Sequence, residues 1–244
     1  MAERTPWRRR VISTVMDPSS GLAIGSGNME RDWDDRARRN APFFVAGFDW
    51  ETPERFVRSG YRDLDAIILN GLDIPGDACV LEIGCGLGRL LRPFSERVRE
   101  AHGVDISSEM VRQGSAALSD CPNVQIHHTS GGLEGLPAGY FDFCYSYNVF
   151  QHISEREAVL RYIHDAAVVL KPGAPFRFQI CRAEAKSPRA RLGGTWLGVR
   201  FTEDELRELL PACGLSIVSI VEEQSPADKL RWDSLVVTCR KAPS

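Results

Sequence analysis

The sequence lacks the features that mark several broad classes of protein. No apolar run approaches the roughly 18 to 20 residues that a membrane-spanning helix needs, and the basic N-terminus is followed only by the short stretch 11–16, which makes a poor signal peptide. With 30 basic and 33 acidic residues, the formal charge is -3, without the basic excess that is typical of nucleic-acid-binding proteins. We therefore expect partners other than membranes and nucleic acids.

The seven cysteines also lack the spacing of a disulfide framework or a metal site. None forms a CxxC pair, and no cluster of Cys and His has the spacing of zinc ligands. The adjacent His127 and His128 have no third ligand at metal spacing, so we predict that no metal is required. Most of the cysteines lie in apolar runs, which favours buried thiols in a reducing cytoplasm.

The 244 residues are enough for one sizeable core with an appendage. Residues 1–29 are turn-rich and are predicted to form a flexible arm, and residues 30–72 a helical cap with helices near 31–40 and 52–71. From residue 73 to 244, short apolar strands alternate with helices. The strands are predicted at residues 79–83, 101–104, 124–128, 141–147, 175–181, 215–221 and 234–239. This alternation predicts an α/β fold with an open, mostly parallel sheet and helices on both faces.

Two helices of this part begin with sequences typical of a capping box. Ser154 is followed three residues later by Glu157, and Thr202 by Glu205. A further helix is predicted to begin near Arg89. The long connection 182–200 has no clear pattern, which in a compact domain often indicates a functional segment.

A glycine loop joins the first predicted strand to a helix. Gly84, Gly86 and Gly88 allow close backbone approach to a ligand, and Asp105 ends the second strand 17 residues after Gly88. Neighbouring parallel strands bring these groups to the same edge of the sheet, where the acid can accept both hydroxyls of a ribose. A purely structural turn and a helix-capping acid are the alternatives.

The charge of Glu82, two residues before the loop, separates two classes of cofactor. A dinucleotide would place its pyrophosphate here, usually above GxGxxG, and a carboxylate beside it would be unfavourable. The same carboxylate would be favourable beside the ammonium and sulfonium groups of S-adenosylmethionine. The third glycine also comes one residue earlier than in GxGxxG, so we prefer the sulfonium cofactor.

Several motifs, in the expected order, resemble those of class I S-adenosylmethionine-dependent methyltransferases, in particular the small-molecule type. They are VLEIGCGLGR at 80–89, GVDIS at 103–107, FDF with YSYNVFQHI between 141 and 153, LKPG at 170–173 and FTEDEL at 201–206. The resemblance spans roughly residues 71–241. It implies a Rossmann-like, seven-stranded sheet whose last strand is antiparallel, and S-adenosyl-L-methionine as the cofactor.

The resemblance also implies roles for individual residues. Gly84, Cys85, Gly86 and Gly88 would line the methionine part of the cofactor, Asp105 would hold the ribose, and Ile106 and Met110 would contact the adenine. Gly132 stands where the family often has an acid, which leaves the adenine to the backbone around Gly132 and Leu133, or to Ser130. Tyr147, Asn148 and Val149 would lie near the transferable methyl group.

Candidates for the chemistry are fewer. His152 has a suitable intrinsic pKa for a general base, although a structural role is the stronger alternative. The acceptor pocket is expected from aromatic side chains and one arginine outside the motifs: Trp33, Phe43, Phe44, Phe48, Trp50, Trp196 and Arg200. Packing of the N-terminal helices onto the sheet is at least as good an explanation for the first five.

These observations favour a cytoplasmic methyltransferase acting on a small molecule, with oxygen as the acceptor atom. The segment after the fourth strand lacks the prolines found in enzymes that methylate exocyclic amines of bases. A cofactor-binding regulatory or scaffold protein without transferase activity, and a nicotinamide dehydrogenase, stay open as alternatives. The acceptor and the oligomeric state are not specified by the sequence.

Overall fold

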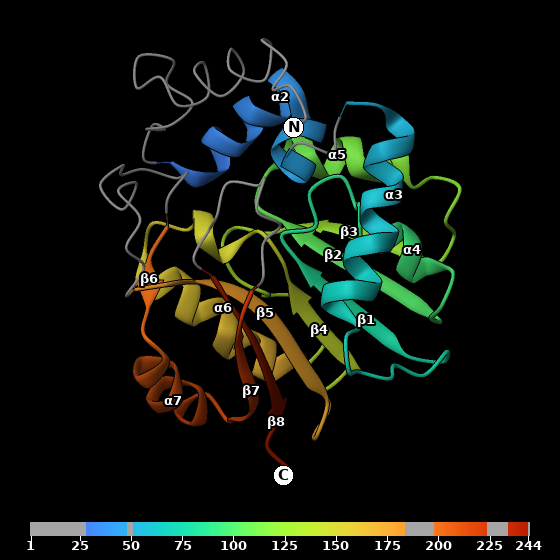
Figure 1. Cartoon of the computed structure of the whole chain (residues 1–244). Helices are drawn as coiled ribbons and strands as arrows, with labels where there is room; N and C mark the ends of the chain where they lie inside the picture. Colours follow the sequence, from blue (N-terminus) through green and yellow to red (C-terminus); the bar gives the residue numbers. More distant parts are fainter. Residues whose placement is uncertain (1–27, 48–50, 184–197, 224–233, 244) are drawn as a thin grey trace, which may run out of the picture.

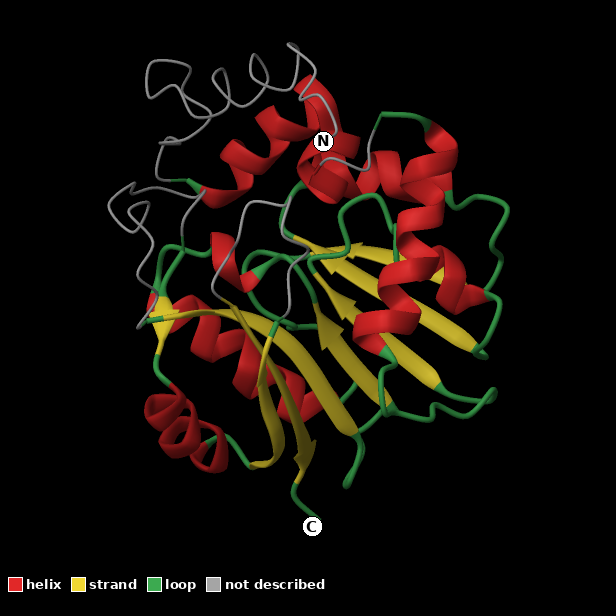
Figure 2. Ribbon diagram, in the orientation of Figure 1, coloured by secondary structure: helices red, strands yellow, loops and turns green. Residues whose placement is uncertain are grey.

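A twisted sheet forms the middle layer of the molecule, with helices packed on both faces (Figures 1 and 2). The computed structural model describes residues 28–47, 51–183, 198–223 and 234–243. The main strands are β1 (Cys79–Ile83), β2 (Glu100–Asp105), β3 (Val124–His128), β4 (Phe143–Ser146), β5 (Pro175–Arg182), β7 (Leu215–Glu222) and β8 (Ser234–Lys241). They are ordered β3-β2-β1-β4-β5-β8-β7.

The pairing confirms the predicted Rossmann-like sheet. Strands β1 to β5 are parallel, and the last strand, β8, lies antiparallel between β5 and β7. One strand was not predicted: the two-residue β6 (Arg200–Phe201) also pairs with β5. All five residues of β1 are buried, as expected for a central parallel strand covered on both faces.

Two apolar clusters hold the layers together. On one face, α6 (Arg156–Val169) and α7 (Glu203–Ala212) pack Ile163 and Leu206 against Phe176 and Phe178 of β5. On the other face, Phe94 of α4 (Leu91–Ser95) packs with Phe143 and Tyr145 of β4. The π-helix Leu64–Ile68, which follows α3 (Pro53–Asp63), joins this second cluster.

The N-terminal helix α2 (Met29–Ala46) lies beyond the carboxyl ends of the strands, next to α5 (Ser108–Ala117) (Figure 1). It is longer than the predicted 31–40, and its backbone leaves helical geometry at Asn40, two residues before Pro42. Most of the predicted arm lies outside the described residues, and so do three candidates for the acceptor pocket: Phe48, Trp50 and Trp196. Within the described residues, no helix is both long and apolar enough to cross a membrane.

Helix starts follow the sequence only in part. Thr202 and Glu205 form the predicted capping box at the start of α7, and Thr52 and Ser107 cap α3 and α5. The box predicted at Ser154 is wrong, because α6 begins after Glu155, which makes no side-chain capping bond. Likewise α4 is shorter than predicted, because residues 86–90 form turns.

Candidate functional site

The glycine loop is shaped by three residues in the left-handed region of backbone space. Gly84, Gly86 and Gly88 have φ of 74°, 53° and 72°, values that residues other than glycine rarely adopt. A Cβ at Gly86 would also lie 2.8 Å from Cγ2 of Val45 in α2. The loop therefore needs glycine both for its backbone angles and for the close approach of neighbouring groups.

Asp105 holds the glycine loop and the start of α5 together. Its Oδ2 accepts a hydrogen bond from the Gly86 amide at 2.8 Å, and its Oδ1 accepts one from the Ser107 amide at 2.9 Å. Burial raises the pKa of Asp105, and these two backbone hydrogen bonds oppose the rise. Each carboxylate oxygen has a further lone pair, so the side chain can still accept ligand hydroxyls.

A cavity opens behind the glycine loop, at the carboxyl ends of β1, β2 and β4. It is referred to below as the central cavity. Most of the predicted site residues line it: Glu82, Gly84, Cys85, Gly86, Asp105, Ile106, Met110, Tyr147, Asn148, Val149, and Phe44 together with Trp33. Residues that were predicted from separate sequence motifs therefore line the same cavity.

Six described residues that were predicted for the site do not line this cavity: Gly88, Gly132, Leu133, Phe43, His152 and Arg200. Arg200 instead donates from Nη1 to the Arg182 carbonyl at 3.1 Å. A Cβ at Gly88 would collide with Leu118, so this glycine serves helix packing. The Gly132 carbonyl accepts a hydrogen bond from the Thr129 hydroxyl, and the Leu133 amide donates to Asp165 at 3.1 Å.

The neighbours of Gly132 take its place in the cavity wall. Ser130, which the sequence offered as the alternative for the adenine, lines the cavity together with Gly131.

The two aromatic candidates outside the cavity pack against aromatic residues that line it. Phe43 contacts Phe44 edge-on, at 5.2 Å between ring centroids. The ring of His152 lies 5.3 Å from that of Trp33, also edge-on, and is 5% exposed.

Other cavity residues were missed: Met29, Val45, Ile83, Arg89, Leu90, Gly131, Ile153, Ser154, Glu155, Ala158, Arg161 and Tyr162. Arg89 directly follows the glycine motif and was the residue most open to prediction. Met29 and Val45 come from α2, and Ala158, Arg161 and Tyr162 come from α6. The approach of these two helices to the loop has no local signal in the sequence.

Glu82 is buried in the wall of the central cavity near the end of β1. It is 3% exposed, and its Oε2 accepts a hydrogen bond from the Tyr145 hydroxyl at 3.1 Å. Burial raises the pKa of Glu82 to about 8, against the opposing effects of Tyr145 and of the charge of Arg89. Glu82 is therefore mostly protonated at neutral pH until a cation approaches it.

Beside Glu82, a polar network fixes the segment after β4. The Tyr147 hydroxyl donates to Glu223 at 2.8 Å, and Gln179 and Ser234 also donate to Glu223. Burial first, and then Glu223, raise the pKa of Tyr147. Tyr147 is thus held as a neutral hydroxyl and is a poor general base.

Asn148 turns the chain at the cavity wall. It is the one described non-glycine residue with positive φ, at 61°, a region that asparagine tolerates better than most residues. Its amide donates to Gln179 Oε1 at 3.0 Å. Outliers of this kind often occur at functional sites.

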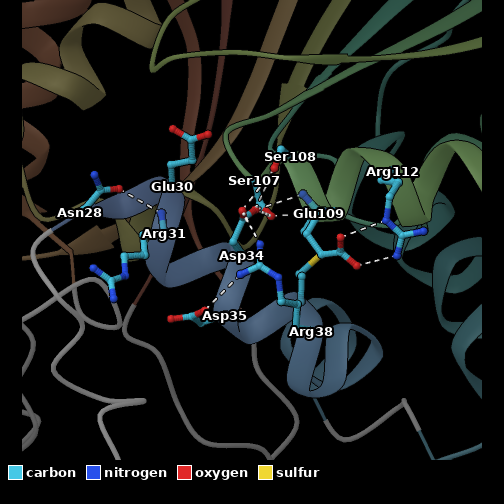
Figure 3. Close-up of polar contacts among 12 residues, drawn as sticks. Asn28, Glu30, Arg31, Asp34, Asp35, Arg38, Ser107, Ser108, Glu109 and Arg112 are labelled. Atoms are coloured by element: carbon cyan, nitrogen blue, oxygen red, sulfur yellow. Dashed lines mark hydrogen bonds and ion pairs between the residues drawn. The ribbon is translucent and has the colours of Figure 1, made fainter.

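Helix α2 contributes Met29, Trp33, Phe44 and Val45 to the cavity wall. The carboxylate of Asp34 attaches this helix to α5 (Figure 3). Asp34 Oδ1 accepts hydrogen bonds from the Ser107 hydroxyl at 2.6 Å and the Glu109 amide at 3.0 Å, and Oδ2 accepts one from Ser108 at 3.2 Å and from Arg38 at 3.1 Å. Burial would raise the pKa of Asp34, but the hydrogen bonds outweigh it and lower the pKa. Asp34 is thus a charged cap for α5.

Comparison with known proteins agrees with this geometry. Residues 80–173 match the family model described as a methyltransferase domain. A ubiquinone biosynthesis O-methyltransferase from Ruegeria pomeroyi is 30% identical over 165 residues, covering 57% of this chain and 60% of that protein. A 23S rRNA (uracil(1939)-C(5))-methyltransferase from Aliivibrio salmonicida is 30% identical over 84 residues, covering 32% of this chain and 19% of that protein. The chain thus spans less than two thirds of either relative.

Among solved structures, an S-adenosylmethionine-dependent methyltransferase from Methanosarcina mazei has the same fold. Its TM-score is 0.61 at 21% identity, and the match covers 75% of this chain and 100% of that one. Over residues 80–173, fold and motifs are thus similar to those of class I S-adenosylmethionine-dependent methyltransferases. The matched family model and the fold imply S-adenosyl-L-methionine as the cofactor. The predicted fold is confirmed, and both comparisons agree with the predicted family and cofactor.

Proposed function

We propose that this chain is an enzyme that transfers the methyl group of S-adenosylmethionine to an oxygen atom of a small molecule. The observation that carries the proposal is the pair of buried carboxylates, Glu82 and Asp105, which line one cavity behind a glycine loop. One carboxylate suits a cationic amino acid end and the other a ribose. A pyrophosphate would place negative charge against the same wall.

The residues present fit the cofactor. The cradle formed by Gly84 and Gly86 accepts no side chains, and Asp105 keeps free lone pairs for hydroxyls. The side chains of Ile106 and Met110 offer apolar contact for a flat ring. When bound, the cofactor supplies an activated methyl group, and the protein has to align an acceptor with it.

Helix α2 would exclude water from the reaction. Met29, Trp33, Phe44 and Val45 bring apolar side chains to the central cavity, and Trp33 and Phe44 suit a flat or apolar acceptor. We keep His152 as a candidate base. It contacts Trp33 and does not line the cavity, so this role requires the imidazole to reach the acceptor.

Sequence similarity and net charge support the choice of a small molecule and of oxygen. The relative from Ruegeria pomeroyi is named as an O-methyltransferase, and it aligns over a longer stretch than the rRNA enzyme. The net charge of -3 also favours an acceptor other than RNA.

Incubation of the purified chain with methyl-labelled S-adenosylmethionine tests the proposal. The acceptor panel contains phenols, carboxylic acids, primary amines and ribosomal RNA, and the readout is labelled product together with S-adenosylhomocysteine. We expect label on phenolic or carboxylic oxygen, and none with Asp105→Ala. Transfer to RNA alone, or tight cofactor binding without turnover on any acceptor, would contradict it.

A further inference from the structure

Arg89 is a buried arginine in the wall of the central cavity, and within the described residues only one of its three guanidinium nitrogens makes hydrogen bonds. It is 6% exposed and lines the cavity beside Glu82. Its Nη1 donates to Asp63 Oδ2 at 2.7 Å and to Ser59 Oγ at 3.1 Å, both on α3. Its Nε finds no hydrogen-bond partner among the residues that the structure describes.

An unpartnered N–H of a buried guanidinium is costly, since buried charged donors normally have partners. The cost is understandable where a ligand supplies the missing acceptor. Helix α3 holds the Arg89 side chain in place through Nη1, which keeps the rest of the planar group in a fixed orientation. A planar carboxylate is the ligand group that such a fork accepts best.

The local charges point to the same kind of ligand group. Asp63 is shared between Arg89 and Arg62, whose Nη2 lies 2.7 Å from Asp63 Oδ1. Two arginines therefore face one aspartate, and Glu82 offers little negative charge while it holds its proton. Arg89 thus places a positive charge, which it shares with Asp63, next to an acid that a cation would ionise.

We propose that Arg89 binds the α-carboxylate of an amino acid end, with Glu82 binding the ammonium group of the same ligand. The assignment deepens the proposed function, on which it rests: the ligand end is the methionine part of the cofactor or product. Arg89 then binds the negative group of the zwitterion, and Glu82 binds its positive group. Selection for a ligand that carries both groups follows from their position side by side.

The test compares two ligands that differ only in the carboxylate. S-adenosylhomocysteine carries it, and S-adenosyl-3-thiopropylamine keeps the amine and lacks it. Calorimetry on the wild-type chain should show the second ligand binding about 10- to 100-fold more weakly, the range for hydrogen bonds to a charged group. With Arg89→Gln, binding of S-adenosylhomocysteine should fall by a similar factor, and binding of the amine should stay unchanged.

Two variants keep the test interpretable. Arg62→Gln removes the other arginine from Asp63 without reaching the cavity wall and should leave the preference for the carboxylate intact. Arg89→Lys keeps a positive charge beside Asp63 should Arg89→Gln fail to fold, and should retain only part of the preference. Thermal unfolding verifies that each variant is folded.

The two ligands also separate the possible failures. A wild-type chain that binds both ligands equally, or an Arg89→Gln variant that weakens both by the same factor, would overturn the assignment of Arg89 and leave the proposed function standing. A wild-type chain that binds neither ligand would overturn the proposed function and the assignment together.

Discussion

Raising the pH should tighten binding of the cofactor product, because Glu82 must lose its proton to pair with the ligand's ammonium group. Burial raises the pKa of Glu82 to about 8 in the ligand-free protein. A neighbouring cation favours the ionised form and lowers that pKa, so binding releases a proton below pH 8. The affinity therefore rises with pH until Glu82 is ionised in the free protein as well.

The size of the effect follows from the pKa. At pH 7 about one Glu82 side chain in ten would be ionised, and at pH 6 about one in a hundred. If the ionised form alone binds, the affinity at pH 7 is about tenfold weaker than at pH 9, and at pH 6 about a hundredfold weaker. The proton released at pH 7 should approach one per ligand.

Isothermal titration with S-adenosylhomocysteine between pH 6 and 9 measures both quantities, provided that buffers of different ionisation enthalpy are compared. Glu82→Gln should bind with an affinity that changes little with pH. Any pH dependence that remains in this variant comes from titration of the ligand and can be subtracted from the wild-type profile. Glu155→Gln is a matched control, since Glu155 also lines the cavity but is exposed. A wild-type affinity independent of pH, or an unchanged slope in Glu82→Gln, would refute the reasoning.

Three further predictions concern single carboxylates. The folded state holds the Glu82 proton up to about pH 8, so the free energy of unfolding of the ligand-free protein should fall as pH rises from about 4.5 to 8. In urea unfolding above pH 8, Glu82→Gln should be about 3 to 5 kcal/mol more stable than the wild type. Equal stability of the two proteins there would contradict the assigned burial of Glu82. Asp34→Ala should lower the free energy of unfolding by about 1 to 2 kcal/mol and speed the release of S-adenosylhomocysteine in stopped-flow experiments. The control Asp35→Ala, at an exposed neighbouring position, should do neither. Similar effects from both variants would mean that Asp34 does not attach α2 to α5. Asp105→Ala should weaken binding of the same ligand at least tenfold, with Asp105→Asn less affected, and full affinity in Asp105→Ala would remove the ribose assignment.

The chemistry-bearing loop could be predicted because its signals are local. Gly84, Gly86 and Asp105 stand at strand ends that parallel pairing brings to one edge of the sheet, so motif spacing alone located the cavity wall. Ser107 also acts locally, since its hydroxyl accepts a hydrogen bond from the Met110 amide and caps α5. Short-range hydrogen bonding decides such features, and the sequence encodes it directly.

Features set by distant contacts could not be predicted in this way. The expected capping box at Ser154 fails because Glu155 is still extended and α6 begins one residue later, after a segment in which the Val199 amide donates to the Ile153 carbonyl at 2.8 Å. Gly132 faces away from the cavity because the Thr129 hydroxyl bonds its carbonyl. In both cases a tertiary or loop contact outweighs the local propensity.

The role of α2 illustrates the same limit. Its residues lie 38 or more positions before Gly84, and its sequence predicted a helical cap with aromatic candidates for the acceptor pocket, without the contact to α5. Asp34 bonds α5 across 73 to 75 residues of chain, and a contact of that separation leaves no periodic signal. The helix and its aromatic pocket candidates could be predicted from the sequence, but its attachment to α5 through Asp34 could not.

The central claim is that two carboxylates and a glycine loop form a cavity for a cationic nucleoside without phosphate. Calorimetric titration of the wild-type chain at pH 8 with S-adenosylmethionine and, separately, with NAD tests it most directly. We predict one molecule of S-adenosylmethionine bound per chain and no binding heat with NAD. Binding of NAD, or of neither compound, would contradict the claim.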